Sequence, residues 1–379
     1  MEQESSCVYG LKQQARSLAC QLAESERNRF FVGTYGVRQD NEIHLLDFDE
    51  DEFEISSQIY KHPDEIWSMS PSPSSTDLLF TTHSSPASSR TATLWRLDSI
   101  ESDESGKLKS QSGTLEPVIN VLWNATGASD KVVALTNTNI TVFAIDVPSK
   151  SAQSSQTIAS PPTRKEQDRK INAGAWNPHQ NDSIAIAADS SVHTYDLRSR
   201  TASTPSLTID HAHHVSVKDV DYNPNKPYQI ATGGDDCVVR VWDTRDVKVP
   251  LKEIVGHSHW IWNVTYNRFH DQLLLSSSSD CTVLLHSLVS ISSAPFGHDD
   301  DVEESPRDGA ETPPSDQDDD ESQGKPTDGL VATYDQHEDS VYSVAWSSGD
   351  PWIFASLSYD GRVVVNMVPR AHKYKIILI

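Results

Sequence analysis

A segment of about 44 residues recurs along this chain, and a repeat of that length restricts the folds that the chain can adopt. Residues 212–245 (AHHVSVKDVDYNPNKPYQIATGGDDCVVRVWDTR) and residues 256–288 (GHSHWIWNVTYNRFHDQLLLSSSSDCTVLLHSL) carry matching residues 44 positions apart, and residues 336–368 form a third copy. Weaker copies bring the number of turn positions to seven, at residues 40, 89, 137, 189, 236, 280 and 360. A fixed period of this kind is the signature of a repeat architecture, so we expect seven structural units.

Each unit contains short β-rich runs bounded by turn residues, such as residues 217–223, 229–233 and 238–243. The period, the Gly-His near the start and the Trp-Asp near the end resemble the WD40 repeat, which implies four strands per blade. We therefore expect an all-β fold, a single seven-bladed β-propeller over residues 1–379, which leaves only short sheet edges. Either residues 7–11 (CVYGL) or residues 374–379 (YKIILI) could pair with the opposite terminal blade and close the ring.

Two stretches do not fit the repeat. Residues 295–329 account for the long last spacing, and between Asp299 and Glu321 they hold twelve acidic residues and one arginine. Low hydrophobicity and high charge predict a disordered acidic insertion between blades six and seven. Ser305, Thr312 and Ser315 in this stretch could be phosphorylated. Residues 148–170 are interpreted as a low-complexity linker between blades three and four.

Charge and composition bear on the possible partners and compartment. The formal net charge of −24 argues against a nucleic-acid binder, because phosphate neutralisation needs a basic surface. The four cysteines form no CxxC pair and indicate reduced thiols. We see no signal peptide and no apolar run long enough to span a membrane, so we expect a cytoplasmic protein with only indirect membrane association.

Recurring Ser/Thr, His and Asp residues look at first like nucleophilic triads. The same set occurs in at least three units, however, whereas a catalytic set normally occurs once. The WD40 resemblance implies instead a buried hydrogen-bond network of His213, Thr232, Asp236 and Trp242. Its counterparts in the next two units are His257, Ser276, Asp280, His337, Ser356 and Asp360. We therefore predict no enzymatic activity.

No cofactor or metal site is predicted. The histidines at 211, 213 and 214, and those at 257 and 259, have no Cys or acidic ligand at a zinc-site spacing beside them. No glycine-rich phosphate loop is present. Cys237 and Cys281 follow the turn aspartates of neighbouring units and are interpreted as turn residues.

Three aromatic residues, Trp67, Trp262 and Tyr342, occupy the same repeat position. Resemblance to other WD40 propellers places this position at the start of each inner strand, on the upper face, together with Trp260, Asp235 and Tyr359. Trp and Tyr often dominate protein interfaces, which favours a partner-binding face. The alternative is that these rings pack the core between the blades.

Two arginines end W/Y-D-x-R sequences in adjacent units, Arg198 in YDLR and Arg245 in WDTR. Propellers that serve as substrate receptors of cullin-type ubiquitin ligases carry such a box at this place. An arginine after Trp-Asp is also common in propellers that have no such role, where it braces the outer strand. Both interpretations stay open.

Longer segments resemble one family, the EARP- and GARP-complex-interacting proteins. They are residues 9–24 (YGLKQQARSLACQLAE), 222–245, 257–280, 287–298 (SLVSISSAPFGH) and 337–378. The resemblance implies a non-enzymatic adaptor of the multisubunit vesicle-tethering complexes, supporting endosomal recycling and retrograde traffic. It further implies protein partners within those complexes, a monomer within a larger assembly, and a location at the trans-Golgi network and recycling endosomes.

Overall fold

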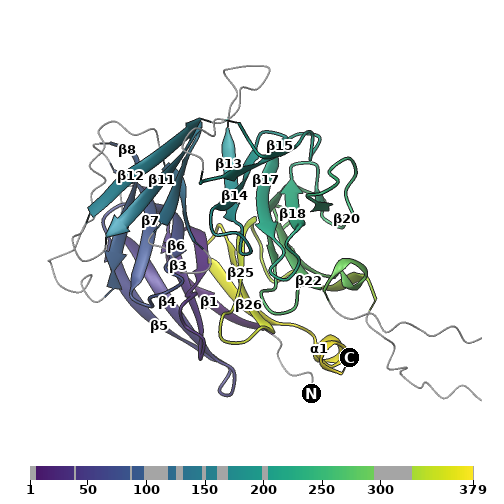
Figure 1. Cartoon of the computed structure of the whole chain (residues 1–379). Coiled ribbons are helices and arrows are strands. Elements are labelled where there is room, and N and C mark those ends of the chain that lie inside the picture. Colours follow the sequence, from purple (N-terminus) through teal and green to yellow (C-terminus); the bar gives the residue numbers. More distant parts are fainter. Residues whose placement is uncertain are drawn as a thin grey trace, which may run out of the picture.

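Seven β-sheets are arranged around a common centre in the computed structural model of the chain (Figure 1). The structure describes residues 6–37, 40–85, 88–97, 118–124, 131–146, 151–159, 170–198, 204–293 and 327–378. All seven sheets are antiparallel, and consecutive strands of the chain are neighbours in each blade, except that the N-terminal strand adds to the outer edge of the last blade. The chain is thus a seven-bladed propeller, and the fold class predicted from the repeat is confirmed.

The first four blades follow the chain from the inner to the outer strand. Blade 1 contains β2 (Ala15–Cys20), β3 (Asn28–Thr34), β4 (Asn41–Asp49) and β5 (Glu54–His62). Blade 2 contains β6 (Glu65–Pro71), β7 (Leu78–Ser85) and β8 (Ser88–Arg96). Blade 3 contains β9 (Val118–Trp123), β10 (Lys131–Thr136), β11 (Asn139–Asp146) and β12 (Ser151–Ala159), and blade 4 contains β13 (Ile171–Trp176), β14 (Ser183–Ala188), β15 (Ser191–Asp196) and β16 (Leu207–Ile209).

The last three blades hold the strongest repeats. Blade 5 contains β17 (Val217–Tyr222), β18 (Gln229–Gly234), β19 (Val238–Asp243) and β20 (Lys252–Val255). Blade 6 contains β21 (Ile261–Tyr266), β22 (Leu273–Ser278), β23 (Val283–Ser287) and β24 (Gly329–Tyr334), with the 3-10 helix η2 (Val289–Ile291) after β23. Blade 7 contains β25 (Val341–Trp346), β26 (Ile353–Ser358) and β27 (Arg362–Met367), and the helix α1 (Arg370–Ile377) follows it.

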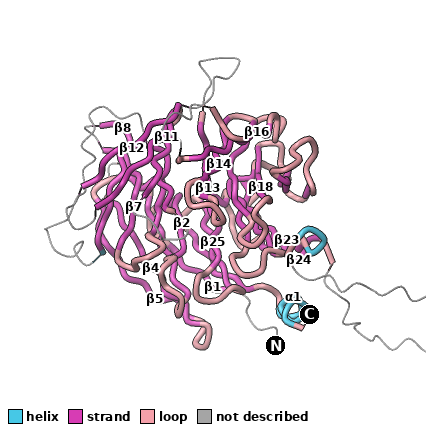
Figure 2. The backbone as a smooth tube through the Cα atoms, in the orientation of Figure 1, coloured by secondary structure: helices cyan, strands magenta, loops and turns pink. Residues whose placement is uncertain are grey.

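Strand β1 (Ser6–Gly10) is the fourth strand of blade 7, so the N-terminal segment closes the ring. It pairs antiparallel with β27, with Ser6 opposite Asn366 and Gly10 opposite Arg362. Of the two closures left open by the sequence, residues 7–11 therefore supply the outer strand. Residues 370–377 form α1, which lies beside the ring (Figures 1 and 2).

The hydrophobic core lies between neighbouring blades. The second strand of each of blades 5, 6 and 7 is buried at all six residues, because it has sheet neighbours on both edges and a blade on both faces. One cluster joins Leu18 and Phe30 of blade 1 to Leu357 of blade 7, and another joins Leu275 of blade 6 to Phe354 of blade 7. Each blade therefore depends on the next one for its apolar contacts, as expected for a closed repeat.

Two boundaries differ from the sequence-based expectation. Residues 151–159, which we had placed in a linker, form β12 and pair along β11, so they belong to blade 3. Their Ser- and Gln-rich sequence hides the strand because an outer strand buries few side chains. Of the predicted acidic insertion, residues 295–326 lie outside the described residues. Asp328 is held by Lys252 and Ser290, and Gly329 already begins β24. In the described part of the chain, no helix is long and apolar enough to cross a membrane.

Candidate functional site

Every inner strand has a β-bulge close to its first residue. In blade 6, for example, Ile261 is opposite Ser278 and Asn263 is opposite Ser277, so that Trp262 has no partner in the ladder. A bulge re-aims the extra side chain and bends the strand locally. We call the seven extra residues the bulge ring; in blade order they are Arg16, Trp67, Ile119, Asn172, Lys218, Trp262 and Tyr342.

Five neighbouring members of the bulge ring form a continuous arc across blades 5, 6, 7, 1 and 2. The Lys218 ammonium lies 5.4 Å from the Trp262 ring centre, and the Trp262 and Tyr342 rings are 4.9 Å apart. The Arg16 guanidinium lies 4.8 Å from the Tyr342 ring centre and 5.3 Å from that of Trp67. Cationic and aromatic side chains thus contact one another from blade to blade.

A second set of residues, in the turns between the second and third strands, lies next to the bulge ring. The Trp262 indole donates a 2.6 Å hydrogen bond to Ser279, and Lys218 forms a 3.1 Å ion pair with Asp235. The Tyr359 ring lies 5.6 Å from that of Tyr342. The sequence predicted that these turn residues share a face with the aromatic positions, and the structure places them in contact.

Trp260 extends the aromatic surface outward. Its side chain is 44% exposed and packs edge-on against Trp262, with ring centres 6.2 Å apart. The bulge-ring residues themselves are partly buried. The rings at 67, 262 and 342 are therefore half-buried: they contact side chains of neighbouring blades, and part of their surface stays exposed.

Sequence reasoning missed the cationic members of this face. Lys218 lies 44 residues before Trp262, so extending the repeat alignment by one unit would have found it. Arg16 lies in blade 1, whose copy of the repeat is too weak for the alignment to place Arg16 at the bulge position. Arg90, from the third strand of blade 2, stacks over Trp67 at 3.4 Å from the ring centre, and no repeat pattern points to it.

Below the bulge ring, the inner strands enclose a cavity of about 470 Å³, lined by residues from the inner strands of all seven blades. Its wall includes two carboxylates of β17. Asp219 accepts hydrogen bonds from the Asn263 side chain and the Val264 amide, and Asp221 accepts one from the Tyr266 amide. Both aspartates thereby join blade 5 to blade 6. Burial raises the pKa of Asp219 to about 7 and that of Asp221 to about 6.

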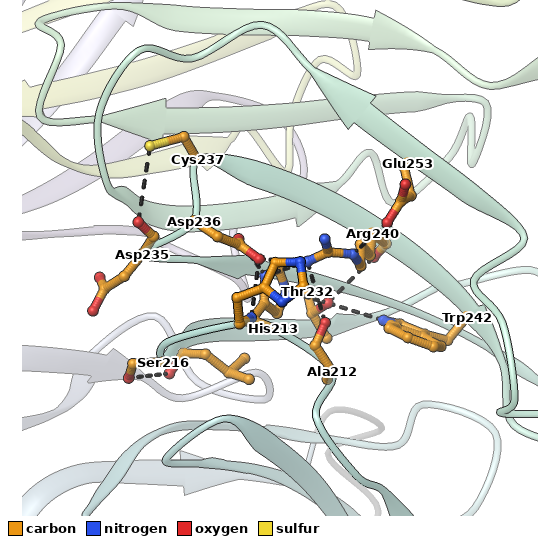
Figure 3. Close-up of polar contacts among 12 residues, drawn as sticks. Ala212, His213, Ser216, Thr232, Asp235, Asp236, Cys237, Arg240, Trp242 and Glu253 are labelled. Atoms are coloured by element: carbon orange, nitrogen blue, oxygen red, sulfur yellow. Dashed lines mark hydrogen bonds and ion pairs between the residues drawn. The ribbon is translucent and has the colours of Figure 1, made fainter.

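The residues assigned to a buried network in blade 5 are joined by hydrogen bonds (Figure 3). His213 contacts Asp236 through Nδ1 at 2.7 Å and Thr232 through Nε2 at 2.8 Å. The Trp242 indole donates to the same Thr232 hydroxyl at 3.0 Å, and Arg240 donates to Asp236 at 2.7 Å. Although burial acts to raise it, hydrogen bonds from His213 and Arg240 hold the pKa of Asp236 well below its usual range.

Gly234 makes this arrangement possible. A Cβ atom at residue 234 would lie 2.3 Å from the Nδ1 atom of His213. The side chain of Asp235 points away from the network (Figure 3), and it forms an ion pair with Lys218. The two adjacent aspartates of this turn therefore have different partners.

Blades 6 and 7 vary the network. His257 contacts Asp280 at 3.0 Å and Ser276 at 2.9 Å. In blade 7, His337 contacts Ser356 at 2.7 Å and Ser358 at 2.9 Å. There the structure does not bring Asp360 directly to the histidine, because Ser358 lies between them and donates to the carboxylate.

Blade 2 has a related network that the sequence analysis did not identify. His62 contacts Thr81 at 3.0 Å, and the Trp95 indole donates to the same hydroxyl at 2.7 Å. The spacing of 19 residues from His to Thr is the same as in blade 5, and this spacing could have identified the blade 2 network from the sequence. In the three later blades the hydroxyl residues Thr232, Ser276 and Ser356 are each 0% exposed. A buried hydroxyl cannot reach a substrate, so these sets serve the fold.

Arg198 and Arg245 have the same geometry in adjacent blades. Each guanidinium folds back onto the aspartate of its own box, with an Nε to Asp196 distance of 2.9 Å and an Nε to Asp243 distance of 2.9 Å. Arg245 also stacks over Tyr228, 4.7 Å from the ring centre. Both arginines are exposed. Among the residues described, no group of three or more His, Cys, Asp or Glu is placed to hold a metal ion.

Comparison with known proteins relates this propeller to one family. A family profile described as EIPR1 beta-propeller matches residues 3–286, and the profile of the WD domain, G-beta repeat, matches residues 329–365. The EARP and GARP complex-interacting protein 1 of Homo sapiens is 40% identical over 406 residues, covering 100% of both chains. The WD repeat-containing protein DWA2 of Arabidopsis thaliana is 33% identical over 96% of this chain and 97% of its own.

A more distant relative extends the same match. The EARP-interacting protein 1 of Caenorhabditis elegans is 31% identical over 98% of each chain. Identity at this level along the whole length, together with a profile that covers most of the propeller, shows a common family. The chain therefore belongs to the EIPR1 β-propeller family of WD40-repeat proteins.

Proposed function

We propose that this chain is a non-enzymatic WD40 adaptor that binds the EARP and GARP vesicle-tethering complexes through the bulge ring and its neighbours. One full-length relative carries both complexes in its name and another carries EARP, and each is 40% identical to this chain. The observation that supports the binding face is the arc of half-buried aromatic and cationic side chains from Lys218 to Trp67. Fixed aromatic and arginine side chains are the usual anchors of protein interfaces.

The proposal includes a cellular role. The adaptor would act in the cytoplasm, at the trans-Golgi network and recycling endosomes, in support of endosomal recycling and retrograde traffic. Association with membranes would be indirect, through the tethering complexes. The chain would act as a monomer within that assembly and would use no cofactor and no nucleic acid.

The test is capture of tethering complexes from cell extract by the tagged chain. Trp260→Ala with Trp262→Ala should abolish capture, because the two changes remove the widest part of the aromatic surface. A matched control is Phe269→Ala with Tyr374→Ala; these aromatic residues are 54% and 58% exposed and lie in the turn between β21 and β22 and on α1. Capture that survives the tryptophan changes, with circular dichroism and melting unchanged, would rule out this face.

A second candidate function, substrate receptor of a cullin-type ubiquitin ligase, is supported by one observation. Arg198 and Arg245 are exposed in adjacent blades and are held in the same orientation by their own aspartates. Under this hypothesis, Arg198→Ala with Arg245→Ala releases a ligase adaptor that co-purifies with the wild-type chain. The hypothesis fails if the wild-type chain recovers no such adaptor.

A further inference from the structure

We infer that the bulge ring recognises an acidic peptide segment of a protein partner, and that Arg16 and Arg90 bind its carboxylates. The inference rests on the proposed function, since it concerns the same face, and it specifies the chemistry of the partner. The position of these two arginines supports it. The aromatic residues alone would not indicate an acidic partner.

Arg16 lies at the middle of the aromatic arc. Its guanidinium carbon is within 6 Å of three ring centres, those of Trp67, Trp262 and Tyr342. Contacts of this kind use the faces of the rings and leave the N–H groups of the guanidinium available. Among the described residues, the Arg16 side chain has neither an ion pair nor a hydrogen-bond partner. A partly buried guanidinium without an acceptor therefore lies at the middle of the aromatic arc.

Arg90 adds a second positive charge at the same place. It stacks over Trp67, the ring that Arg16 also contacts, and it forms no ion pair with a carboxylate in the part of the chain that the structure describes. Burial, and then the nearby charge of Arg16, lower the pKa of Arg90, while Tyr35 and Glu65 act in the opposite direction. Two like charges held close together, with only Glu65 as a nearby opposite charge, leave a surplus of positive charge that attracts an anion.

The charge of the face contrasts with that of the chain. The formal net charge is −24, yet the bulge ring contains two cations and no acidic residue. Lys218 is already paired with Asp235, which leaves the unpaired charge in blades 1 and 2, beside Trp67. An acidic partner would be attracted to this point, so charge would help to fix where it docks.

A peptide carboxylate fits this site better than a phosphate group or a nucleic acid. Glu65 and Asp235 border the two arginines and Lys218, so the local surplus of positive charge is small and suits single negative charges. The aromatic rings on both sides of Arg16 offer apolar surface to residues next to an acidic one. The arrangement therefore matches an extended segment in which acidic and apolar side chains alternate.

The direct test is fluorescence polarisation with a fluorescein-labelled octapeptide in which Glu alternates with Phe. We expect binding to the wild-type chain that weakens with added salt, and an affinity at least about tenfold lower for Arg16→Gln with Arg90→Gln, since charge-assisted pairs are strong. The exposed Arg245→Gln is the matched control and should bind as wild type. A peptide with Gln in place of Glu should not bind.

Three results would overturn the inference: equal binding of the acidic peptide by the wild-type chain and the double variant, equal binding of the Gln peptide, or preferred binding of a phosphoserine peptide. Melting curves verify that each variant is folded. Arg16→Lys with Arg90→Lys should recover part of the affinity, because the charge is kept while the planar fork is lost.

Capture of tethering complexes separates this inference from the proposed function. Loss with the tryptophan variant but not with Arg16→Gln and Arg90→Gln would leave the proposed function standing and reject the role of the arginines. If the wild-type chain captures no tethering complex, the proposed function fails, and the peptide measurement alone decides whether the ring recognises acidic segments.

Discussion

The guanidinium carbon of Arg16 lies 4.8 Å from the centre of the Tyr342 ring, although the two residues belong to the first and the last blade of the chain. This contact exists only because the propeller is closed. The closure is made by β1, which completes blade 7 ahead of blade 1. The proposed binding face thus depends on the N-terminal segment of the chain.

Deleting residues 1–10 should therefore destabilise the propeller. The deletion removes the five residue pairs between β1 and β27, and each lost backbone hydrogen bond costs about 1 kcal/mol. We expect the urea unfolding midpoint to fall clearly. Deleting residues 371–379 is the matched control, since α1 has no buried residue, and its effect should be smaller. Equal effects of the two deletions would contradict the closure by β1.

Thr232→Val tests the hydrogen-bond network of blade 5. The change preserves shape but leaves the Trp242 indole N–H and the Nε2 atom of His213 without their shared partner. Two buried polar groups left unpaired cost about 2–4 kcal/mol in the free energy of unfolding. Denaturant titration measures it, with the exposed Thr333→Val of β24 as a control that should change little. A loss below about 0.5 kcal/mol would show that the network is not important for stability.

Cys237→Gly and Cys281→Gly should each stabilise the fold. Both cysteines are turn residues with positive φ, 63° and 66°, a region in which glycine avoids the steric cost paid by other residues. The gain is expected to be up to about 1 kcal/mol each, visible as a higher melting temperature. Cys237→Val, which is β-branched, should act in the opposite direction. Equal melting temperatures of the glycine and valine variants would mean that the positive φ at this turn carries no steric cost.

The repeat made the number and position of the blades predictable, because the seven turn positions follow from residue spacing alone. Six of the seven coincide with the turns between the second and third strands, whereas residue 89 lies inside β8, just after that turn. The network residues of blade 5 were assigned by resemblance, and the same atoms meet in the structure. In blade 7 the sequence did not predict that Ser358 lies between His337 and Asp360. That placement depends on the rotamer of Ser358, which the repeat alignment does not give.

The candidate face was only partly predictable, for a physical reason. Aromatic residues stood out against the polar background, whereas Arg16 and Lys218 look like ordinary surface charges in a linear sequence. In the structure both are the extra residue of a β-bulge, and both contact aromatic rings of neighbouring blades. Outer strands such as β12 were missed because their side chains are mostly solvent-exposed and carry no apolar alternation.

Asp219→Asn should change how stability depends on pH. Burial raises the pKa of Asp219 to about 7, well above its value in an unfolded chain. Between about pH 4 and pH 7 the folded state therefore binds more protons at this residue than the unfolded state, so its contribution to the free energy of unfolding falls as pH rises. Asparagine removes this dependence and, at pH 7.5, should stabilise the chain by at least about 1 kcal/mol.

The substitution is conservative, because one oxygen atom of Asp219 accepts both hydrogen bonds from blade 6, and asparagine keeps one such oxygen. Blade 6 itself carries an asparagine, Asn263, at the equivalent position, where it bonds to the Val344 amide of blade 7. Unfolding free energies measured from pH 4 to 8 should give a variant minus wild-type difference that grows to pH 7 and then levels off. The exposed Asp335→Asn serves as the control and should give a flat difference. A flat difference for Asp219→Asn as well would show that this carboxylate is ionised throughout the range and is solvated or paired in a way that its burial does not suggest.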